Sequence, residues 1–332
     1  MSFFPSAAMA NDSYPRLLGD IGGTNARLAW QMGHAAPLTD VVTYACAEHD
    51  SLLAAIRRYL AEHGKQRPST CAIGIANPIL GDHVQMTNHH WSFSISALQQ
   101  GLGVKRLKVI NDFTALALSL PTLQPADLLR IGHGGVAVPG AALAVLGPGT
   151  GLGVAGLLPS GVCGFVPVTG EGGHVTLAAQ SEFETAVIGL LTHRFGHASA
   201  ERALSGPGLV NLYDAASTLA NRTPLPLRPA DVIERARDDA DPSCVAAIDL
   251  FCKFLGGVAG NLALTLGARG GVYIGGGLAP RLQAQIERSA FRERFVGKGR
   301  FRGYLEAIPT FIIDAQTSPA LTGAARALDM AD

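Results

Sequence analysis

Two glycine-rich turns in the sequence have the composition of phosphate-binding loops. They are Gly19-Asp20-Ile21-Gly22-Gly23-Thr24 and Gly147-Pro148-Gly149-Thr150-Gly151. Glycines let the backbone approach a phosphate closely, consecutive N–H groups can surround an anion, and each threonine adds a hydroxyl donor. The carboxylate of Asp20 would repel phosphate unless a cation intervened, which predicts Mg²⁺ at this residue. Either turn alone could be an ordinary hairpin turn, but together with Asp20 they favour a nucleotide site.

Two common nucleotide motifs are excluded. The sequence contains no G-x-x-x-x-G-K-[ST], so it has no P-loop. Gly151 to Gly156 matches G-x-G-x-x-G, but a Rossmann motif requires a helix directly after it, and Pro159, Gly161 and Gly164 forbid that helix.

The pair Asn111-Asp112 follows a predicted strand at 107–110 and opens a predicted helix near Phe113. Both residues are preferred helix N-caps, so capping alone could explain them. Ligands of open α/β sheets, however, bind at the carboxyl ends of strands. A carboxylate there is ionised at neutral pH and could accept a proton from a substrate hydroxyl.

A third polar segment is Gly170-Glu171-Gly172-Gly173-His174, which places an acid and an imidazole three positions apart. A metal site lacks an evident third ligand, and a polyhydroxylated ligand suits these donors and acceptors better. Glu201 alone would be a surface residue. Gly275-Gly276-Gly277 follows a predicted strand at 271–274 and offers flat backbone for an adenine. His89-His90 are interpreted as structural or surface histidines.

The elements that position these residues alternate between strands and helices. Strands are predicted at 16–19, 26–31, 71–76, 107–110, 142–146, 152–158, 162–168, 271–274 and 311–313. Helices are predicted near 52–60, 181–195, 208–217, 230–239 and 243–266, after 113 and 280, and at the end. Thr24 and Thr150 lie 126 positions apart (150 − 24), and each turn begins a mixed α/β block. Two similar blocks facing a cleft would explain the repeat, and so would a chance resemblance of two hairpins.

Composition excludes several classes of protein. The chain has 332 residues, no formal net charge, 40 glycines and 48% hydrophobic residues, which argues against disorder, collagen and a general attraction to nucleic acid or anionic membranes. Five cysteines without a C-x-x-C pair predict a reducing cytosol. The apolar stretch 245–266 contains Asp249, Lys253 and Asn261, so a buried helix is predicted rather than a membrane span.

Two further segments carry predictions of their own. The basic residues between Arg292 and Arg302 are interpreted as a solvated helix end and loop rather than a phosphate-binding patch. Residues 1–15 are predicted to be disordered and have no assigned role.

Together these segments resemble the bacterial glucokinases, of the hexokinase-like group in the superfamily of actin, sugar kinases and heat-shock-chaperone ATPases. The resemblance extends from about residue 16 to 325 and keeps the family's order. The stretches that carry it are LLGDIGGTNARLA (17–29), MTNHHWSFSI (86–95), INDFTALAL (110–118), LGPGTGLGVA (146–155), GEGGHV (170–175), SAERALSGPGLVNLY (199–213), GGVAGNLAL (256–264) and GGVYIGGGLAPR (270–281).

The resemblance implies an α/β, two-domain, actin-like ATPase fold of the ribonuclease-H-like type, with mixed sheets and a central cleft. Residues 1–122 plus 316–332 would form the small domain and 123–315 the large domain. The implied activity is ATP-dependent phosphorylation of the glucose 6-hydroxyl, an entry to glycolysis, with Mg²⁺ and without zinc. A cytoplasmic homodimer with no nucleic-acid or membrane partner is expected.

The same resemblance assigns roles by position. Asn111, Asp112, Glu171, His174 and Glu201 match the sugar-binding set, and Asp112 matches the general base. The nucleotide set comprises Gly19, Asp20, Ile21, Gly22, Gly23, Thr24, Gly149, Thr150, Gly151, Gly275, Gly276 and Gly277, with Asp20 near Mg²⁺. Gly277 stands where an aliphatic residue is common in the family.

Two alternatives stay open. A related kinase could act on mannose or an amino sugar, although repressor-type sugar kinases commonly carry a cysteine-rich zinc segment and residues 175–199 contain no cysteine. A sugar-responsive regulator on the same fold would need a DNA-binding helix-turn-helix, and only about 15 residues precede the first predicted strand.

Overall fold

The computed structural model describes residues 13–161, 164–237 and 240–330. Their contacts form two compact units: unit 1 contains the described residues up to 123 and from 316 onward, and unit 2 spans residues 124–315. Most of the segment predicted to be disordered, residues 1–12, lies outside the described residues. The prediction is wrong for residues 13–15, because Thr70 Oγ1 donates to the Ser13 carbonyl at 2.7 Å and Ser69 Oγ to the Tyr14 carbonyl at 2.6 Å.

Unit 1 is built on a five-stranded sheet of order β3-β2-β1-β4-β7. Its strands are β1 (Arg16–Ile21), β2 (Asn25–Gln31), β3 (Thr39–Ala45), β4 (Thr70–Ile75) and β7 (Arg106–Asn111). β2 pairs antiparallel with both β1 and β3, whereas β4 pairs parallel with both β1 and β7. A separate hairpin joins β5 (His83–Gln85) to β6 (Ser92–Ser94). The parallel strands β1, β4 and β7 therefore end at one edge of the sheet.

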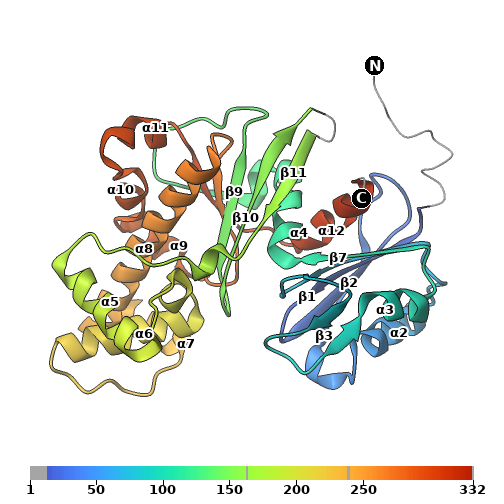
Figure 1. Cartoon of the computed structure of the whole chain (residues 1–332), viewed down its shortest axis with the longest axis horizontal. Helices are drawn as coiled ribbons and strands as arrows, with labels where there is room; N and C mark the ends of the chain where they lie inside the picture. The colour runs from blue at the N-terminus through green and yellow to red at the C-terminus, as the bar shows by residue number, and fades with distance from the viewer. Residues whose placement is uncertain (1–12, 162–163, 238–239, 331–332) are drawn as a thin grey trace. The chain divides into compact units, whose positions relative to one another are not determined.

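Helices cover both faces of this sheet (Figure 1). α2 (Leu52–Glu62) and α3 (Ile95–Leu102) share one core with Leu17 and Ile21, and α12 (Pro319–Asp329) shares another with Leu18. α4 (Asp112–Ser119) packs along α12. Leu18 and Asp20 point to the same face because strand side chains alternate. Asp20 therefore lies on the face covered by α4 and α12.

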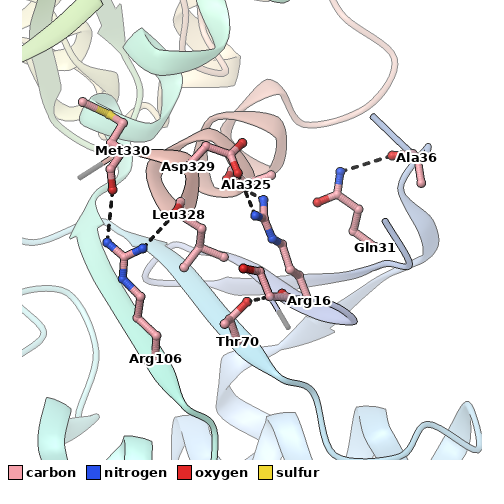
Figure 2. A network of polar contacts seen from close by, with 10 residues as sticks. Arg16, Gln31, Ala36, Thr70, Arg106, Ala325, Leu328, Asp329 and Met330 are labelled. Carbon is pink, nitrogen blue, oxygen red and sulfur yellow. Dashed lines mark hydrogen bonds and ion pairs between the residues drawn. The ribbon is translucent and has the colours of Figure 1, made fainter. Parts of the chain in front are cut away.

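Two arginines fasten the end of α12 to the sheet (Figure 2). Arg16, which is 4% exposed, donates to the Ala325 carbonyl at 3.1 Å and to Asp329 Oδ1 at 2.7 Å. Arg106 donates to the carbonyls of Leu328 and Met330 at 2.9 and 3.1 Å. The last described turn of the chain is thus part of the architecture of unit 1.

Unit 2 has a six-stranded sheet of order β11-β10-β9-β12-β13-β8. Its strands are β8 (Leu128–Ile131), β9 (Leu143–Pro148), β10 (Leu152–Ser160), β11 (Gly164–Thr169), β12 (Val272–Ile274) and β13 (Thr310–Ile313). β11, β10 and β9 pair antiparallel in turn, and β9, β12 and β13 pair parallel. This is the pairing pattern of β3-β2-β1-β4-β7, with β8 added, so the repeated turns begin two similar blocks rather than two unrelated hairpins.

The core of unit 2 surrounds the helix α8 (Pro242–Leu266). By length and composition α8 could cross a membrane, but 67% of its most apolar stretch is buried inside the structure, as in a core helix. It packs against α6 (Gly206–Leu219), α7 (Pro229–Arg237) and α10 (Phe291–Val296). The other helices of this unit are α5 (Glu182–Phe195), α9 (Gln283–Arg288) and α11 (Arg302–Glu306).

The basic stretch between Arg292 and Arg302 is less solvated than predicted. Arg292 Nη2 donates to the Glu306 carbonyl at 3.1 Å, and Arg294 Nη2 contacts Glu184 Oε2 at 2.6 Å. Lys298 Nζ donates to Asn261 Oδ1 at 2.7 Å. These cations tie α10 and the loop after it to neighbouring elements. Among the described cysteines, Cys46, Cys71, Cys244 and Cys252 are buried free thiols.

Candidate active site

The first glycine turn, residues 22–24, connects β1 to β2 and is supported on two sides. Gly22 N donates to the Asn25 carbonyl at 2.9 Å, and Cys46 N donates to the Thr24 carbonyl at 2.8 Å. On the other side, a Cβ at Gly23 would lie 3.0 Å from Asn88 Cβ and 3.1 Å from the Asn88 carbonyl oxygen. Thr24 is exposed. The turn thus exposes its threonine to solvent, while the Thr24 carbonyl is held by the backbone of Cys46.

Asp20 is held by two neighbours. Its Oδ2 accepts hydrogen bonds from Arg27 Nη1 at 3.0 Å and from Ser318 Oγ at 2.6 Å. Ser318 is the N-cap residue of α12, but its side chain makes no cap bond, and its hydroxyl donates to Asp20. Oδ1 has no hydrogen-bond partner among the described residues, and the side chain is 21% exposed. One carboxylate with a spare oxygen suits Mg²⁺, which is commonly held by one or two carboxylates plus substrate phosphates.

Asn111 is the last residue of β7 and is in register with Ile75 of β4, which in turn pairs with Ile21 of β1; Asp112 follows it directly. They therefore share a sheet edge with the first turn. Asn111 caps α4, since its Oδ1 accepts from Phe113 N at 2.9 Å and from Thr114 N at 3.2 Å. Asp112 is the first helical residue, and its Oδ1 accepts from Phe113 N at 2.9 Å. The capping explanation holds for Asn111 and leaves its amide nitrogen available to a ligand.

Close packing fixes the start of α4. A Cβ at Gly74 of β4 would lie 3.0 Å from Ala115 Cβ and 3.6 Å from the Asp112 Cα. At the contact of α4 with α12, a Cβ at Gly323 would overlap the carbonyl of Ala115. The helix that carries Asp112 is therefore packed against both β4 and α12, with no room for a side chain at Gly74 or Gly323.

The second glycine turn, residues 149–151, connects β9 to β10 and is supported from outside its own hairpin. Gly206 N donates to the Gly149 carbonyl at 2.8 Å. Leu152 N donates to Glu201 Oε2 at 2.9 Å, and this carboxylate occupies the space that a Cβ at Gly151 would need. Gly149 has open space where a Cβ would stand and no positive φ. Neither the backbone conformation nor the packing therefore requires glycine at position 149. At position 151, by contrast, glycine leaves the space that the Glu201 carboxylate occupies.

The turn at Gly275–Gly277 lies against the end of β9. Gly275 N donates to the Leu146 carbonyl at 2.9 Å and Leu278 N to the Pro148 carbonyl at 3.2 Å. Gly276 has φ +77° and its Cβ position is filled by the backbone of Pro148, so this glycine is structural. Gly277 has open space instead. The predicted adenosine segment and the second turn are thus neighbours.

The segment 170–175 packs tightly against β10. Gly172 to His174 form a 3₁₀ turn, and a Cβ at Gly172 would lie 2.8 Å from Val154 Cβ. Ala200 N donates to the Val175 carbonyl at 2.9 Å, which places the residue before Glu201 beside this turn. Glu171 and His174 are exposed. The structure therefore gathers Glu171, His174 and Glu201 around the start of β10.

Each unit brings its own predicted residues together: the first turn with Asn111-Asp112 in unit 1, and the second turn with the sugar and adenosine segments in unit 2. Sequence reasoning missed three neighbours. Arg27 faces Asp20 across the β1–β2 hairpin, a pairing that the turn length alone would have indicated. The contacts of Asn88 with Gly23 and of Ser318 with Asp20 join distant segments and carry no local signal.

Comparison with known proteins identifies close relatives. The sequence model of the family described as Glucokinase matches residues 17–331. The glucokinase of Aromatoleum aromaticum is 54% identical over 322 residues, which are 97% of this chain and 96% of that protein. A glucokinase structure from an Antarctic psychrotroph has a TM-score of 0.86 at 36% identity and covers 95% of this chain and 98% of its own.

A second solved structure extends the likeness of fold. The glucokinase of Balamuthia mandrillaris, in complex with glucose, has a TM-score of 0.75 at 24% identity and covers 94% of this chain and 92% of its own. Structures of this kind have the actin-like ATPase fold, which confirms the predicted fold class.

Proposed function

Because the chain belongs to the glucokinase family and is a glucokinase enzyme, whose general reaction is ATP-dependent glucose phosphorylation, we propose that Asp112 is its general base. In this proposal the γ-phosphoryl group of ATP passes to the 6-hydroxyl of D-glucose and gives glucose 6-phosphate. The observation that carries it is the position of Asp112: a carboxylate on a clamped helix start, at the sheet edge that also holds the first glycine turn.

Asp112 accepts the proton of the 6-hydroxyl as the bond from that oxygen to phosphorus forms. Phosphoryl transfer passes through a loose transition state, so positioning and charge neutralisation supply most of the acceleration and a strong base is unnecessary. Asn111 binds the same sugar through its amide nitrogen, because its oxygen already accepts two backbone hydrogen bonds. The capping role and the sugar-binding role of Asn111 are therefore compatible.

The two glycine turns bind the phosphates of ATP. Thr24 and Thr150 are exposed and donate hydroxyl hydrogen bonds, while the glycines beside them let oxygens approach the backbone. Gly275 to Gly277 receive the adenosine. Asp20 would hold Mg²⁺ through its spare oxygen, and such an ion would supply neutralisation of phosphate charge. Arg27, which is bonded to Asp20, adds a cation beside the first turn.

Glu171, His174 and Glu201 bind the sugar hydroxyls from unit 2. A polar site that loses one hydroxyl partner is left with an unpaired group, and such sites can reject the wrong analogue by roughly 10⁴-fold. These three residues therefore set the preference for glucose over other hexoses. A homodimeric state and a cytoplasmic location remain predictions from the family resemblance.

The experiment that tests this function is ADP release with ATP and Mg²⁺ across five sugars: glucose, mannose, fructose, galactose and N-acetylglucosamine. We expect kcat/KM to be highest for glucose, with phosphate recovered at the 6-position of the product. Faster turnover of mannose or N-acetylglucosamine would move the assignment to another hexose, and no turnover of any sugar would contradict it.

A further inference from the structure

Unit 2 contains a cavity of about 300 Å³ that none of the proposed catalytic, sugar-binding or nucleotide-binding residues lines. It is enclosed by α8 on one side and by the segment from Val175 to Gln180 on the other. Its apolar walls are Val154, Leu177, Phe254, Val258 and Leu262. This volume is at the lower end of the range for small-molecule sites, and a largely apolar wall with a few polar groups is typical of them.

The polar end of this cavity carries an uncompensated positive charge. Three cations line it, Lys253, Arg294 and Lys298, and none of its lining residues is acidic. Lys253 is paired with Asp249 at 2.6 Å, and Arg294 is paired at 2.6 Å with Glu184, whose side chain is 2% exposed. Lys298 has only neutral partners among the described residues.

The ammonium of Lys298 retains a donor for a ligand. Its Nζ donates to Asn261 Oδ1 at 2.7 Å and to the Gly257 carbonyl at 3.0 Å, which uses two of its three N–H groups. Partial burial and the nearby guanidinium of Arg294 lower the pKa of Lys298, which means that the surroundings disfavour its charged form. Partial burial of a charge without a counterion is unfavourable, and an anion beside Lys298 would offset that cost.

We propose that this cavity binds an amphipathic carboxylate, with its alkyl chain among the apolar walls and its carboxylate on Lys298. A short aliphatic chain suits the apolar walls, and the anionic head supplies the counterion that Lys298 lacks. We also propose that occupancy changes the affinity for glucose, a step that rests on the proposed function.

The coupling follows from the residues that line the cavity, because two of them are sequence neighbours of proposed sugar-binding residues. Gly172 lines the cavity and packs so closely against Val154, another lining residue, that a Cβ at position 172 would not fit. A displacement of Val154 would therefore move the 3₁₀ turn that contains Gly172. Val175 lines the cavity as well, and its carbonyl binds Ala200 N. The three sugar-binding residues of unit 2 are the immediate sequence neighbours of Gly172, Val175 and Ala200. A ligand that shifts this wall therefore shifts Glu171, His174 and Glu201.

Binding is tested by titrating the purified enzyme with sodium octanoate in a calorimeter, with octanol and octylammonium as probes of equal chain length. We expect saturable binding of one octanoate, at least tenfold tighter than either control. Lys298→Gln should weaken octanoate about tenfold, the effect of one lost charge-assisted hydrogen bond. Val258→Phe should weaken all three probes by filling the cavity. Arg300→Gln removes a neighbouring exposed charge that does not line the cavity and should change nothing.

Coupling is tested by measuring the KM for glucose with and without octanoate. We expect a shift of at least twofold in wild type and Arg300→Gln, and none in Lys298→Gln. Calorimetry needs no turnover, so absence of glucose phosphorylation would contradict the proposed function and leave the binding result standing. No saturable octanoate binding, or equal binding of the three probes, would overturn the site. Octanoate binding that Lys298→Gln weakens, with an unchanged KM for glucose, would overturn the coupling.

Discussion

Glu201 Oε2 accepts a hydrogen bond from the backbone N–H of Leu152 at 2.9 Å, across 49 positions of sequence. The bond joins a residue of the proposed sugar set to the first residue after the second glycine turn. Gly151 makes room for it, because a side chain there would overlap the carboxylate. If the proposed roles are right, this one carboxylate contributes to the binding of both glucose and ATP.

Glu201→Ala should therefore raise the KM for glucose and the KM for ATP together. The backbone N–H of Leu152 loses its acceptor, a loss worth about 1–3 kcal/mol, and the turn at 149–151 loosens. Glu201→Gln keeps an acceptor oxygen and should affect ATP much less than glucose. Steady-state kinetics with each substrate varied separately measures both effects, and an alanine variant in which only the glucose KM changed would argue against the shared role.

Gly323→Ala should destabilise unit 1 by about 2–4 kcal/mol, because the added methyl group would overlap the carbonyl of Ala115 and push α12 off α4. Since α4 carries Asp112, kcat should fall as well. The matched control is Gly189→Ala, at an exposed helical position of α5 with open space, which should stabilise by about 0.5–1 kcal/mol. Urea unfolding of both variants provides the comparison, and equal effects would show that α12 does not clamp α4.

Gly149→Ala and Gly276→Ala should separate a ligand-binding glycine from a structural one. Position 149 has open space and no positive φ, so its variant should keep wild-type stability while raising the KM for ATP at least tenfold. Position 276 has φ +77° and meets the Pro148 backbone, so its variant should lose stability first. Melting temperature and ATP kinetics distinguish the two, and wild-type ATP kinetics in Gly149→Ala would remove that glycine from the phosphate site.

The stability of the folded protein should depend on pH in the acid range through the carboxyl group of Asp231. Hydrogen bonds from the Arg228 side chain and backbone lower the pKa of this carboxyl group to about 2. A carboxyl group whose pKa is lower in the folded state stabilises the fold at pH values above its pKa in the unfolded chain. This contribution is lost as the pH falls through the pKa of the folded state. The difference in melting temperature between wild type and Asp231→Asn should therefore be largest above pH 5 and shrink towards pH 3. A difference that stayed constant or grew on acidification would have the wrong sign.

Local sequence signals predicted the elements that carry the site. The two glycine-threonine turns, the strands before them and the apolar helix α8 lie where the pattern placed them, because turns and continuous apolar runs depend on neighbouring residues. β3 was missed, since most of this edge strand is exposed and lacks an apolar alternation. The predicted helix from 280 begins as a 3₁₀ turn at Pro280–Leu282 and continues as the short helix α9.

The features that the sequence did not predict depend on contacts between segments far apart in the chain. The docking of α12 through Arg16 and Arg106, and the capture of Asp20 by Ser318, depend on where the chain returns after residue 315. The basic stretch around Arg294 and Lys298 was interpreted as solvated because composition alone does not reveal the buried partner Glu184. The assignment of chemical roles from residue types and spacing stays a prediction, whereas the contacts that hold those residues in place could be learned only from the structure.

Whether Asp112 accepts the proton of the glucose 6-hydroxyl can be decided with the variant Asp112→Asn. The amide keeps the shape of the side chain and an oxygen for Phe113 N, so α4 should remain folded and glucose should still bind in a calorimeter. We predict that kcat falls by at least 10²-fold, the usual effect of losing a general base, while the dissociation constant for glucose changes by less than about tenfold. A folded Asp112→Asn enzyme with a kcat near that of wild type would contradict the account.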